Sequence, residues 1–284
     1  MHVFLAGATG VLGRRVLPRL RAAAHQVTAL TRTDDGAAAI RAAGGVPVIG
    51  DVYDREELAR VLGKAAPDTV MHQLTDLREG SSDANARMRE TGTRNLVDAA
   101  RAAGVRRIVA QSIAWAYEGG PDPADESTPL DLTAAAPRKT TIEGVVALES
   151  AVRELPEWVV LRYGLLYGPG TWYAPGELMA GKSQAGTLAA DDDVSSFVHV
   201  GDATTAAVQA LAWPSGATVN ITDDEPAPAR KWVPVFCAAV GAPPPVDRPP
   251  APRAPWARGA DNHYARKHLG WVPEHPSWRT GFFT

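Results

Sequence analysis

Gly7-Ala8-Thr9-Gly10-Val11-Leu12-Gly13 is the stretch of sequence that decides the fold. It follows an apolar run at residues 3–6 and precedes residues 11–21, which have helical spacing. Glycines at a strand–turn–helix junction allow backbone to approach a pyrophosphate, and the free N–H groups of the helix N-terminus favour phosphate. The segment therefore predicts a dinucleotide site, with these cofactor-binding residues: Gly7, Thr9, Gly10, Val11, Leu12 and Gly13.

Strand-like and helix-like segments alternate through the first half of the chain. Apolar runs at 27–30, 46–49, 69–74, 108–110 and 158–161 are separated by helical stretches at 54–64, 84–103 and 141–155. Strands that alternate with helices are typical of right-handed βαβ units and a parallel sheet. We therefore expect an α/β fold, a Rossmann-type doubly wound parallel sheet.

The pattern changes after residues 167–170. Shorter strands are predicted at 197–200 and 219–221, with helices up to 212 and at 230–240, and residues 241–255 are rich in proline and alanine. We expect residues 1–168 together with 196–222 to form the NADP-binding Rossmann domain. Residues 169–195 and 223–284 are expected to form a small C-terminal substrate lobe.

Composition narrows the classes of partner. The 284 residues carry a net charge of −3, which does not favour nucleic acid or an anionic membrane surface as a partner. No window approaches the roughly 20 apolar residues that span a bilayer, and no basic and apolar leader is evident at the N-terminus. The single cysteine, Cys237, cannot form an internal disulfide. We expect a cytoplasmic protein.

The end of the second predicted strand bears on the choice between NAD and NADP. An NAD site usually places an acidic residue there, to hold the ribose 2′-hydroxyl. This chain has Thr31-Arg32-Thr33 instead. Because a guanidinium can hold a 2′-phosphate in a fork, Thr31 and Arg32 favour NADP(H). Asp34 and Asp35, which follow, would weaken such a site, and Arg32 as a solvated surface residue is the other interpretation.

Several ordered motifs together resemble the extended and atypical short-chain dehydrogenase/reductases, the epimerase/dehydratase-like relatives included. The motifs are the glycine segment, residues 50–52, 70–75, 91–96, 161–170 and 197–202. The resemblance implies a Rossmann fold and further cofactor-binding residues: Asp51, Val52, Leu74, Thr75, Gln111, Tyr163, Gly164 and Leu165. It extends to ketoreductases that tailor secondary metabolites such as antibiotics.

One departure from this family is central. Its reactive centre is a Ser or Thr after the fifth strand, followed by Y-x-x-x-K, in which Tyr is the general acid/base and Lys lowers its pKa and binds ribose. Here the Ser position falls on Ile113, next to Ser112, and the Tyr and Lys positions fall near Thr141 and Val145. No Y-x-x-x-K occurs anywhere in the chain.

Three sources of a proton are then open. A hydroxyl of Ser112, Tyr117 or Thr141 could donate to a carbonyl oxygen, so these three are the candidate catalytic residues. Solvent or the substrate itself could supply the proton instead. In each case we expect positioning against NADPH to provide much of the acceleration, up to roughly 7–11 kcal/mol in favourable systems. Ser112 and Tyr117 could equally serve as structural or lining residues.

Aromatic residues gather in the segments expected near the substrate edge. Trp115, Trp172, Tyr173 and Met179 suit a flat apolar substrate better than a sugar nucleotide, although they could equally form the core of the lobe. The segment 172–193 has Lys182 as its one cation and three aspartates at 191–193, which argues against a diphosphate. Residues 76–87 contain a loop signal and are a candidate flap.

These observations favour an NADPH-dependent ketoreductase acting on a bulky, aromatic, polyketide-type ketone. Two alternatives stay open: a sugar-nucleotide epimerase or dehydratase, and a non-enzymatic NADP-binding regulator. The expected partner is a small-molecule ketone, with neither nucleic acid nor membrane. No metal site is expected, since the histidines are scattered. The chain is expected to be a monomer or a homodimer.

Overall fold

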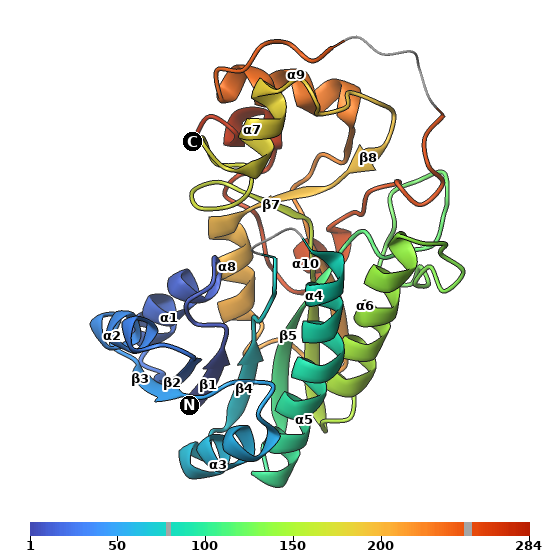
Figure 1. The fold of residues 1–284 in the computed structure, drawn as a ribbon. Coiled ribbons are helices and arrows are strands. Elements are labelled where there is room, and N and C mark those ends of the chain that lie inside the picture. Colours follow the sequence, from blue (N-terminus) through green and yellow to red (C-terminus); the bar gives the residue numbers. More distant parts are fainter. Residues whose placement is uncertain (78–80, 247–251) are drawn as a thin grey trace. The chain divides into compact units, whose positions relative to one another are not determined.

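A computed structural model describes residues 1–77, 81–246 and 252–284 (Figure 1). The chain divides into two compact units. Unit 1 comprises residues 1–112, 132–161 and 207–218, and unit 2 comprises residues 113–131, 162–206 and 219–284. The predicted substrate lobe, residues 169–195 with 223–284, lies wholly within unit 2. Within the described residues, no helix has the length and apolar character that a membrane crossing requires.

The central sheet has seven strands in the order β10-β6-β5-β4-β1-β2-β3. Strands β1, β2, β3, β4 and β5 pair in parallel, as the alternating pattern predicts. The strand order reverses between β1 and β4, and ligands of such sheets bind outside the carboxyl ends of the strands at this switch point. The strand bounds are β1 (His2–Ala6), β2 (Gln26–Thr31), β3 (Val46–Ile49), β4 (Thr69–His72), β5 (Arg107–Ile113), β6 (Glu157–Tyr163) and β10 (Ala217–Ile221).

Three helices of unit 1 begin at side chains that cap them. Thr33, Asp54 and Ser81 each accept a hydrogen bond from the backbone three residues later. The helix predicted over 84–103 contains a π-helical turn, so it consists of three segments. The bounds are α1 (Gly13–Ala22), α2 (Asp34–Ala42), α3 (Arg55–Ala65), α4 (Ser82–Arg87), the π turn η1 (Met88–Gly92), α5 (Thr93–Ala102) and α6 (Arg138–Val152). Helix α4 occupies the second half of the candidate flap, of which residues 78–80 lie outside the described residues.

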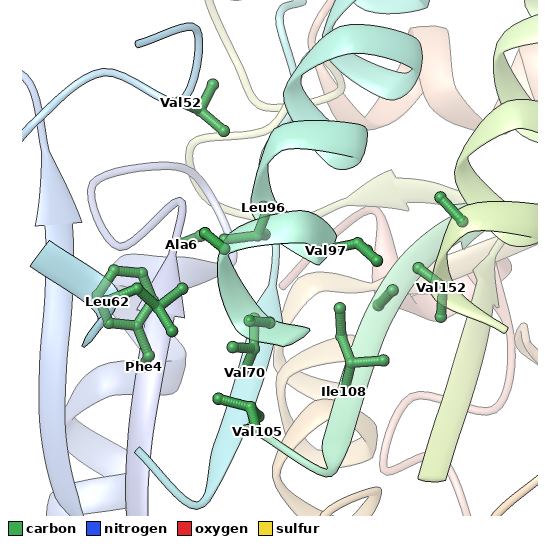
Figure 2. Close-up of a cluster of buried hydrophobic side chains, with 14 of the residues drawn as sticks. Phe4, Ala6, Val52, Leu62, Val70, Leu96, Val97, Val105, Ile108 and Val152 are labelled. Atoms are coloured by element: carbon green, nitrogen blue, oxygen red, sulfur yellow. The ribbon is translucent and has the colours of Figure 1, made fainter. Parts of the chain in front are cut away.

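The core of unit 1 lies between the sheet and helices α3, α5 and α6. Phe4, Val70 and Ile108 project from three neighbouring strands toward Leu62 and Leu96 (Figure 2). Alternate strand residues such as Val3 and Leu5 are also fully buried. Strand β1 is therefore covered on both faces, which is why its sequence is a near-continuous apolar run.

Unit 2 has two small strand pairs and an aromatic core. Strands β7 (Leu165–Tyr167) and β9 (Phe197–His199) are parallel, and β8 (Val194–Ser195) and β11 (Ala227–Pro228) are antiparallel. The rings of Tyr173, Phe197 and Phe282 pack edge-to-face or stacked around helix α9 (Ala229–Ala239). Tyr173 is thus a core residue of this unit, and partly buried Met179 packs against the core. The other helices are α7 (Leu178–Gln184), α8 (Val200–Gln209), which runs on into unit 1, α10 (His263–His268) and α11 (Trp278–Gly281).

Two buried aspartates fasten the C-terminal segment of unit 2. Asp202 accepts hydrogen bonds from the backbone N–H groups of Glu274 and His275. Asp223 accepts one from the backbone N–H of Trp278, and burial raises the pKa of its carboxyl group to about 8. The segment after the proline-rich stretch is therefore ordered. Residues 247–251 of the stretch predicted to be irregular lie outside the described residues.

Candidate functional site

The glycine turn of unit 1 has the geometry that a phosphate site needs. Gly7 has φ +94°, and a Cβ atom there would lie 2.5 Å from the Gln73 carbonyl oxygen. A Cβ on Gly13 would lie 2.0 Å from the Gly7 oxygen, whereas one on Gly10 would meet that oxygen at 3.3 Å. Gly7 and Gly13 are therefore required by the protein's own packing. Gly10 is exposed and leaves room for a ligand.

The start of helix α1 is open to an anion. Leu12 at its N-cap makes no side-chain capping bond, and the first turn contains no acidic residue. The N–H groups of Arg14 and Arg15 already donate to the carbonyl oxygens of Gly10 and Leu12, and the N-terminal end of a helix carries a partial positive charge. Thr9 is exposed and Val11 is half-buried beside this turn. The turn can hold a pyrophosphate, as the sequence predicts.

Residues expected to meet the adenosine half lie at the ends of β2 and β3. Arg32 is exposed just beyond buried Thr31. The Asp51 carboxylate accepts a hydrogen bond from the Tyr53 backbone, and Arg87 lies 4.5 Å from the centre of the Tyr53 ring. Burial raises the pKa of Tyr53, and the charges of Arg87 and Arg32 oppose that shift. Two positively charged side chains, Arg32 and Arg87, therefore lie near this edge of the sheet.

Hydrogen bonds connect the end of β4 to the start of helix α5 and to the end of β5. His72 is fully buried, its Nδ1 accepts the N–H of Leu74 at 3.2 Å, and its Nε2 lies 2.9 Å from Thr93 Oγ1. Burial and the charge of Arg89 lower the pKa of His72 to about 4. A neutral ring that accepts at Nδ1 carries its proton on Nε2, so His72 donates to Thr93.

Gln111 completes this connection, because its Nε2 donates to the carbonyl oxygen of Leu74 at 2.7 Å. This bond fixes the loop that follows β4, at the carboxyl edge where the resemblance places Leu74 and Thr75. Thr75 itself is exposed. The structure thus brings the unit 1 residues predicted for the cofactor to one edge of the sheet.

The candidate catalytic residues of unit 1 have different surroundings. The Ser112 hydroxyl donates to Glu149 Oε1 at 2.9 Å, and both side chains are buried. Arg153 donates to the other carboxylate oxygen of Glu149 at 2.8 Å. Thr141 lies half-buried near the start of α6, and Val145, at the lysine position of the family, is fully buried. Glu149 was not anticipated as a partner of Ser112, since the two are 37 positions apart.

The third candidate, Tyr117, lies in unit 2. Its hydroxyl donates to Asn220 Oδ1 at 2.5 Å, and the guanidinium of Arg162 lies 4.8 Å from the centre of its ring. Tyr163 is buried, and a Cβ on Gly164 would lie 2.7 Å from the Ser196 carbonyl oxygen. Leu165 donates its N–H to that same oxygen. Gly164 is therefore required by the close approach of two backbone segments.

A cavity of about 210 Å³ opens in unit 2 between two tryptophans. Trp115 and Trp256 are 36% and 37% exposed, so each presents part of its ring to the cavity. The sequence predicted Trp115 at a substrate edge but missed Trp256, which lies after the proline-rich stretch and carries no periodic signal. The lining residues are Ala114, Trp115, Leu165, Asp193, Val194, Ser195, Ser196, Trp256, Ala257 and Gly259.

One cluster in unit 2 brings together groups that can ligate a metal, which the scattered histidines did not predict. His199, Asp202 and His275 have ligand atoms within 4.8 Å of one another. Asp202 Oδ2 already accepts from both the backbone N–H and Nδ1 of His275, and His199 Nδ1 accepts the N–H of Gly201. The centres of the two imidazole rings are 3.7 Å apart, and their planes are tilted by 33°. These contacts fasten the C-terminal segment.

Comparison with known proteins agrees with this geometry. The model of a family described as NAD(P)H-binding matches residues 7–199. The chain is 44% identical, over 304 aligned positions and 99% of both chains, to a 3-diazoavenalumate denitrifying reductase from a Streptomyces species. It is also 35% identical over 133 positions, 46% of this chain and 39% of the relative, to a 4-hydroxy-2-methyl-3-oxo-4-farnesyl-3,4-dihydroquinoline-1-oxide ketoreductase from Stigmatella aurantiaca.

Among solved structures, the chain is similar to the UDP-glucose 4-epimerase of Thermus thermophilus in complex with NAD. The TM-score is 0.79 at 24% identity, with 100% of this chain and 97% of the other covered. This likeness concerns the fold. It agrees with the predicted Rossmann-type sheet of epimerase/dehydratase-like proteins.

Proposed function

We propose that this chain, which belongs to the NAD(P)H-binding family, is an NADPH-dependent reductase of a flat, electrophilic aromatic compound. It is an oxidoreductase with the epimerase/dehydratase-like fold of short-chain dehydrogenase/reductases. The preferred substrate class is an aryl diazo compound, which is reduced with loss of dinitrogen. A ketone is the second candidate.

One observation carries the diazo assignment: the chain keeps the glycine turn predicted to bind the cofactor, but the family's acid/base tyrosine is replaced near Thr141. Reduction of a ketone builds an alkoxide, which needs a proton or strong hydrogen-bond donors. Replacement of an aryl diazonium group by hydrogen has no such need. The ring carbon gains a C–H bond, the C–N bond breaks, and its electron pair leaves with N₂. The full-length relative at 44% identity is named as a denitrifying reductase.

The residues of unit 1 would hold the cofactor, which supplies the hydride when bound. The turn at Gly10 and the first turn of α1 would bind its pyrophosphate. Asp51 and Val52 would meet the adenine, and Arg32 would form a fork on the 2′-phosphate. The exposure of Arg32 and the absence of an acidic residue at position 31 favour NADPH over NADH.

Unit 2 would bind the aromatic substrate. The walls formed by Trp115 and Trp256 suit a flat ring, and the volume of about 210 Å³ is below the roughly 300–1,000 Å³ of sites for drug-sized ligands. One substituted ring fits such a space. Asp193 is the charged residue among the described residues of the lining, and none of these is a lysine or an arginine. A nucleotide sugar, with its diphosphate, is therefore disfavoured as the substrate.

The ketone candidate is favoured by the second relative, a ketoreductase similar to nearly half of this chain. For a ketone, Ser112, Thr141 or Tyr117 would have to donate to the developing alkoxide, or the proton would come from solvent or substrate. The hydroxyls of Ser112 and Tyr117 already donate to Glu149 and Asn220. Thr141 is therefore the first hydroxyl to test in this case.

The test uses NADPH carrying deuterium at the transferred position. The protein is incubated with a 3-diazo-4-hydroxyphenyl carboxylate, with a panel of aromatic ketones, and with UDP-glucose. We expect gas release and an arene carrying one deuterium at the carbon that bore nitrogen. A deuterated alcohol would select the ketone candidate, and isomerised UDP-glucose in a parallel reaction supplied with NAD⁺ in place of NADPH would overturn the proposal. Reactions without protein correct for direct reduction of the diazo compound by NADPH.

A further inference from the structure

Arg89 is a buried arginine whose Nε has no hydrogen-bond partner. The side chain is 4% exposed. Within the described residues, no carboxylate lies within ion-pair distance of it. Burying a guanidinium in this way is costly unless a partner compensates. The missing partner is a reason to look for a ligand.

The position of Arg89 is set by three neighbours in unit 1. A Cβ on Gly144 of α6 would lie 3.4 Å from Arg89 Cδ, so the stem of the arginine passes close to that glycine. The charge of Arg89 contributes to the low pKa of His72 at the end of β4. Burial lowers the pKa of Arg89 to about 10, and the charge of Glu149 opposes this shift. Arg89 therefore lies among β4, the Ser112–Glu149 pair and α6.

The backbone at Arg89 is also unusual, because the residue is in the π-helical turn η1. Single π turns within helices occur frequently at functional sites. This turn has Arg89 at its second position, and Thr93, the partner of His72, follows its end. The same irregularity thus positions both a buried cation and the residue that orders the end of β4.

The strand order indicates which part of the cofactor lies nearby. The two halves of a dinucleotide lie on either side of the switch point, here between β1 and β4. The adenosine half belongs over β2 and β3, where Arg32 and Asp51 are. The nicotinamide half then belongs over β4 and β5, beside Arg89. Val145, at the family's lysine position, is apolar and offers no cation there.

We propose that Arg89 binds the ribose of the nicotinamide half, with its guanidinium N–H groups donating to the ribose hydroxyl oxygens. This role rests on the proposed placement of the cofactor and does not depend on the substrate. In related proteins, a lysine on the following helix binds this ribose. Here an arginine from the π turn would make that contact instead. Arg89 is then a cofactor-binding residue that no sequence motif indicated.

Two cofactor fragments test this proposal without any turnover. Adenosine 2′-phosphate 5′-diphosphate ends at the pyrophosphate, and 2′-phospho-ADP-ribose adds the ribose. Calorimetry measures the dissociation constant of each for the unaltered protein, Arg89→Met and Arg89→Lys. Arg101→Met is the matched control, because Arg101 is an exposed arginine paired with Glu154, just after the end of α6.

We expect Arg89→Met to weaken binding of 2′-phospho-ADP-ribose by about 10-fold to 100-fold, the range for lost hydrogen bonds to a charged donor. Binding of the shorter fragment should be unchanged, Arg89→Lys should recover part of the loss, and Arg101→Met should lose nothing. An equal loss of affinity for both fragments would place Arg89 on the pyrophosphate or indicate damage to the fold. No loss of affinity for either fragment would mean that Arg89 is a structural residue. Either result overturns the proposal. Thermal unfolding without ligand identifies a damaged fold.

The binding measurements on the two fragments do not depend on whether the protein reduces a diazo compound or a ketone. If the fragments bind as expected but no diazo compound or ketone is reduced, the proposed function fails while the role of Arg89 stands. If reduction is observed but Arg89→Met binds both fragments normally, the reverse holds.

Discussion

Ser112 donates its hydroxyl hydrogen to Glu149 Oε1 at 2.9 Å, and neither side chain is exposed by more than 1%. A serine in this position is already engaged within the protein. Glu149 in turn receives a second hydrogen bond, from Arg153. The pair joins the carboxyl end of β5 to helix α6 at the place where the related enzymes carry their reactive residues.

Replacing Ser112 with Ala is expected to lower stability more than activity. The substitution leaves Glu149 Oε1 without its donor, which costs about 1–3 kcal/mol in a buried site. If dinitrogen is the leaving group, the reaction needs no proton from Ser112, so turnover of the diazo substrate should change less than about threefold. A tenfold change would correspond to about 1.4 kcal/mol in the activation free energy. Urea unfolding and steady-state kinetics measure the two effects.

Thr141→Val is the companion variant, because its side chain has nearly the same volume but lacks the hydroxyl. Full activity of both variants on the diazo compound would agree with reduction that needs no side-chain acid. A loss of 100-fold or more in either, with cofactor affinity intact, would contradict it and restore proton donation by that residue.

The three glycines of the turn should respond differently to alanine. Gly7→Ala should unfold unit 1 or destabilise it by several kcal/mol, because φ is +94° and the new Cβ would meet backbone at 2.5 Å. Gly10→Ala should leave the melting temperature nearly unchanged and weaken NADPH binding at least about 10-fold, through its clash with the ligand. Gly63→Ala in α3, with nothing within 4 Å of the new Cβ, is the control and should be neutral or stabilising by up to about 1 kcal/mol.

Arg32→Gln is expected to reduce the preference for NADPH. Losing a charged fork on a phosphate should weaken NADPH binding by about 10-fold to 100-fold and leave NADH binding unchanged. Fluorescence titration with both cofactors gives the ratio. Arg41→Gln, at the far end of α2, is the control. Equal loss for the two cofactors would mean that Arg32 does not contact the 2′-phosphate.

The two tryptophans of the cavity should control substrate affinity. Trp256→Ala or Trp115→Ala should raise KM for the aromatic substrate by about 10-fold, since burial of an aromatic face and ring stacking are lost. The dissociation constant of NADPH should not change. Trp172 is 37% exposed, as Trp256 is, but does not line the cavity. Trp172→Ala is therefore the control. An equal rise in KM for this variant would contradict the assignment of the cavity as the substrate site.

Acid should destabilise the protein through His72. Its pKa falls from 6.5 to about 4 on folding, so the unfolded chain binds more protons between these values. Stability should therefore be unaffected by His72 above about pH 6.5 and should decrease as the pH falls toward 4, by about 3 kcal/mol in the limit. His72→Gln should flatten this part of the curve. Denaturant unfolding at pH 4.5 and 7.5 for both proteins gives the difference, and parallel curves would contradict the assignment.

The sequence by itself determined the α/β sheet and the cofactor edge. The glycine turn, the apolar strands and Arg32 are local signals, because each depends on a few neighbouring residues and on strand or helix period. The predicted strand at 46–49 matches β3 residue for residue. The loss of Y-x-x-x-K was also visible directly in the sequence.

Only the tertiary structure decided which residues meet within each unit. Glu149 meets Ser112, Arg89 lies beside Gly144, and Trp256 faces the cavity, although these residues are far apart in sequence or lie in stretches without periodicity. The π turn that carries Arg89 was predicted as plain helix, because one extra residue in a turn leaves no compositional signal. Such contacts depend on the packing of whole elements, and packing of that kind is not encoded in any short segment of the chain.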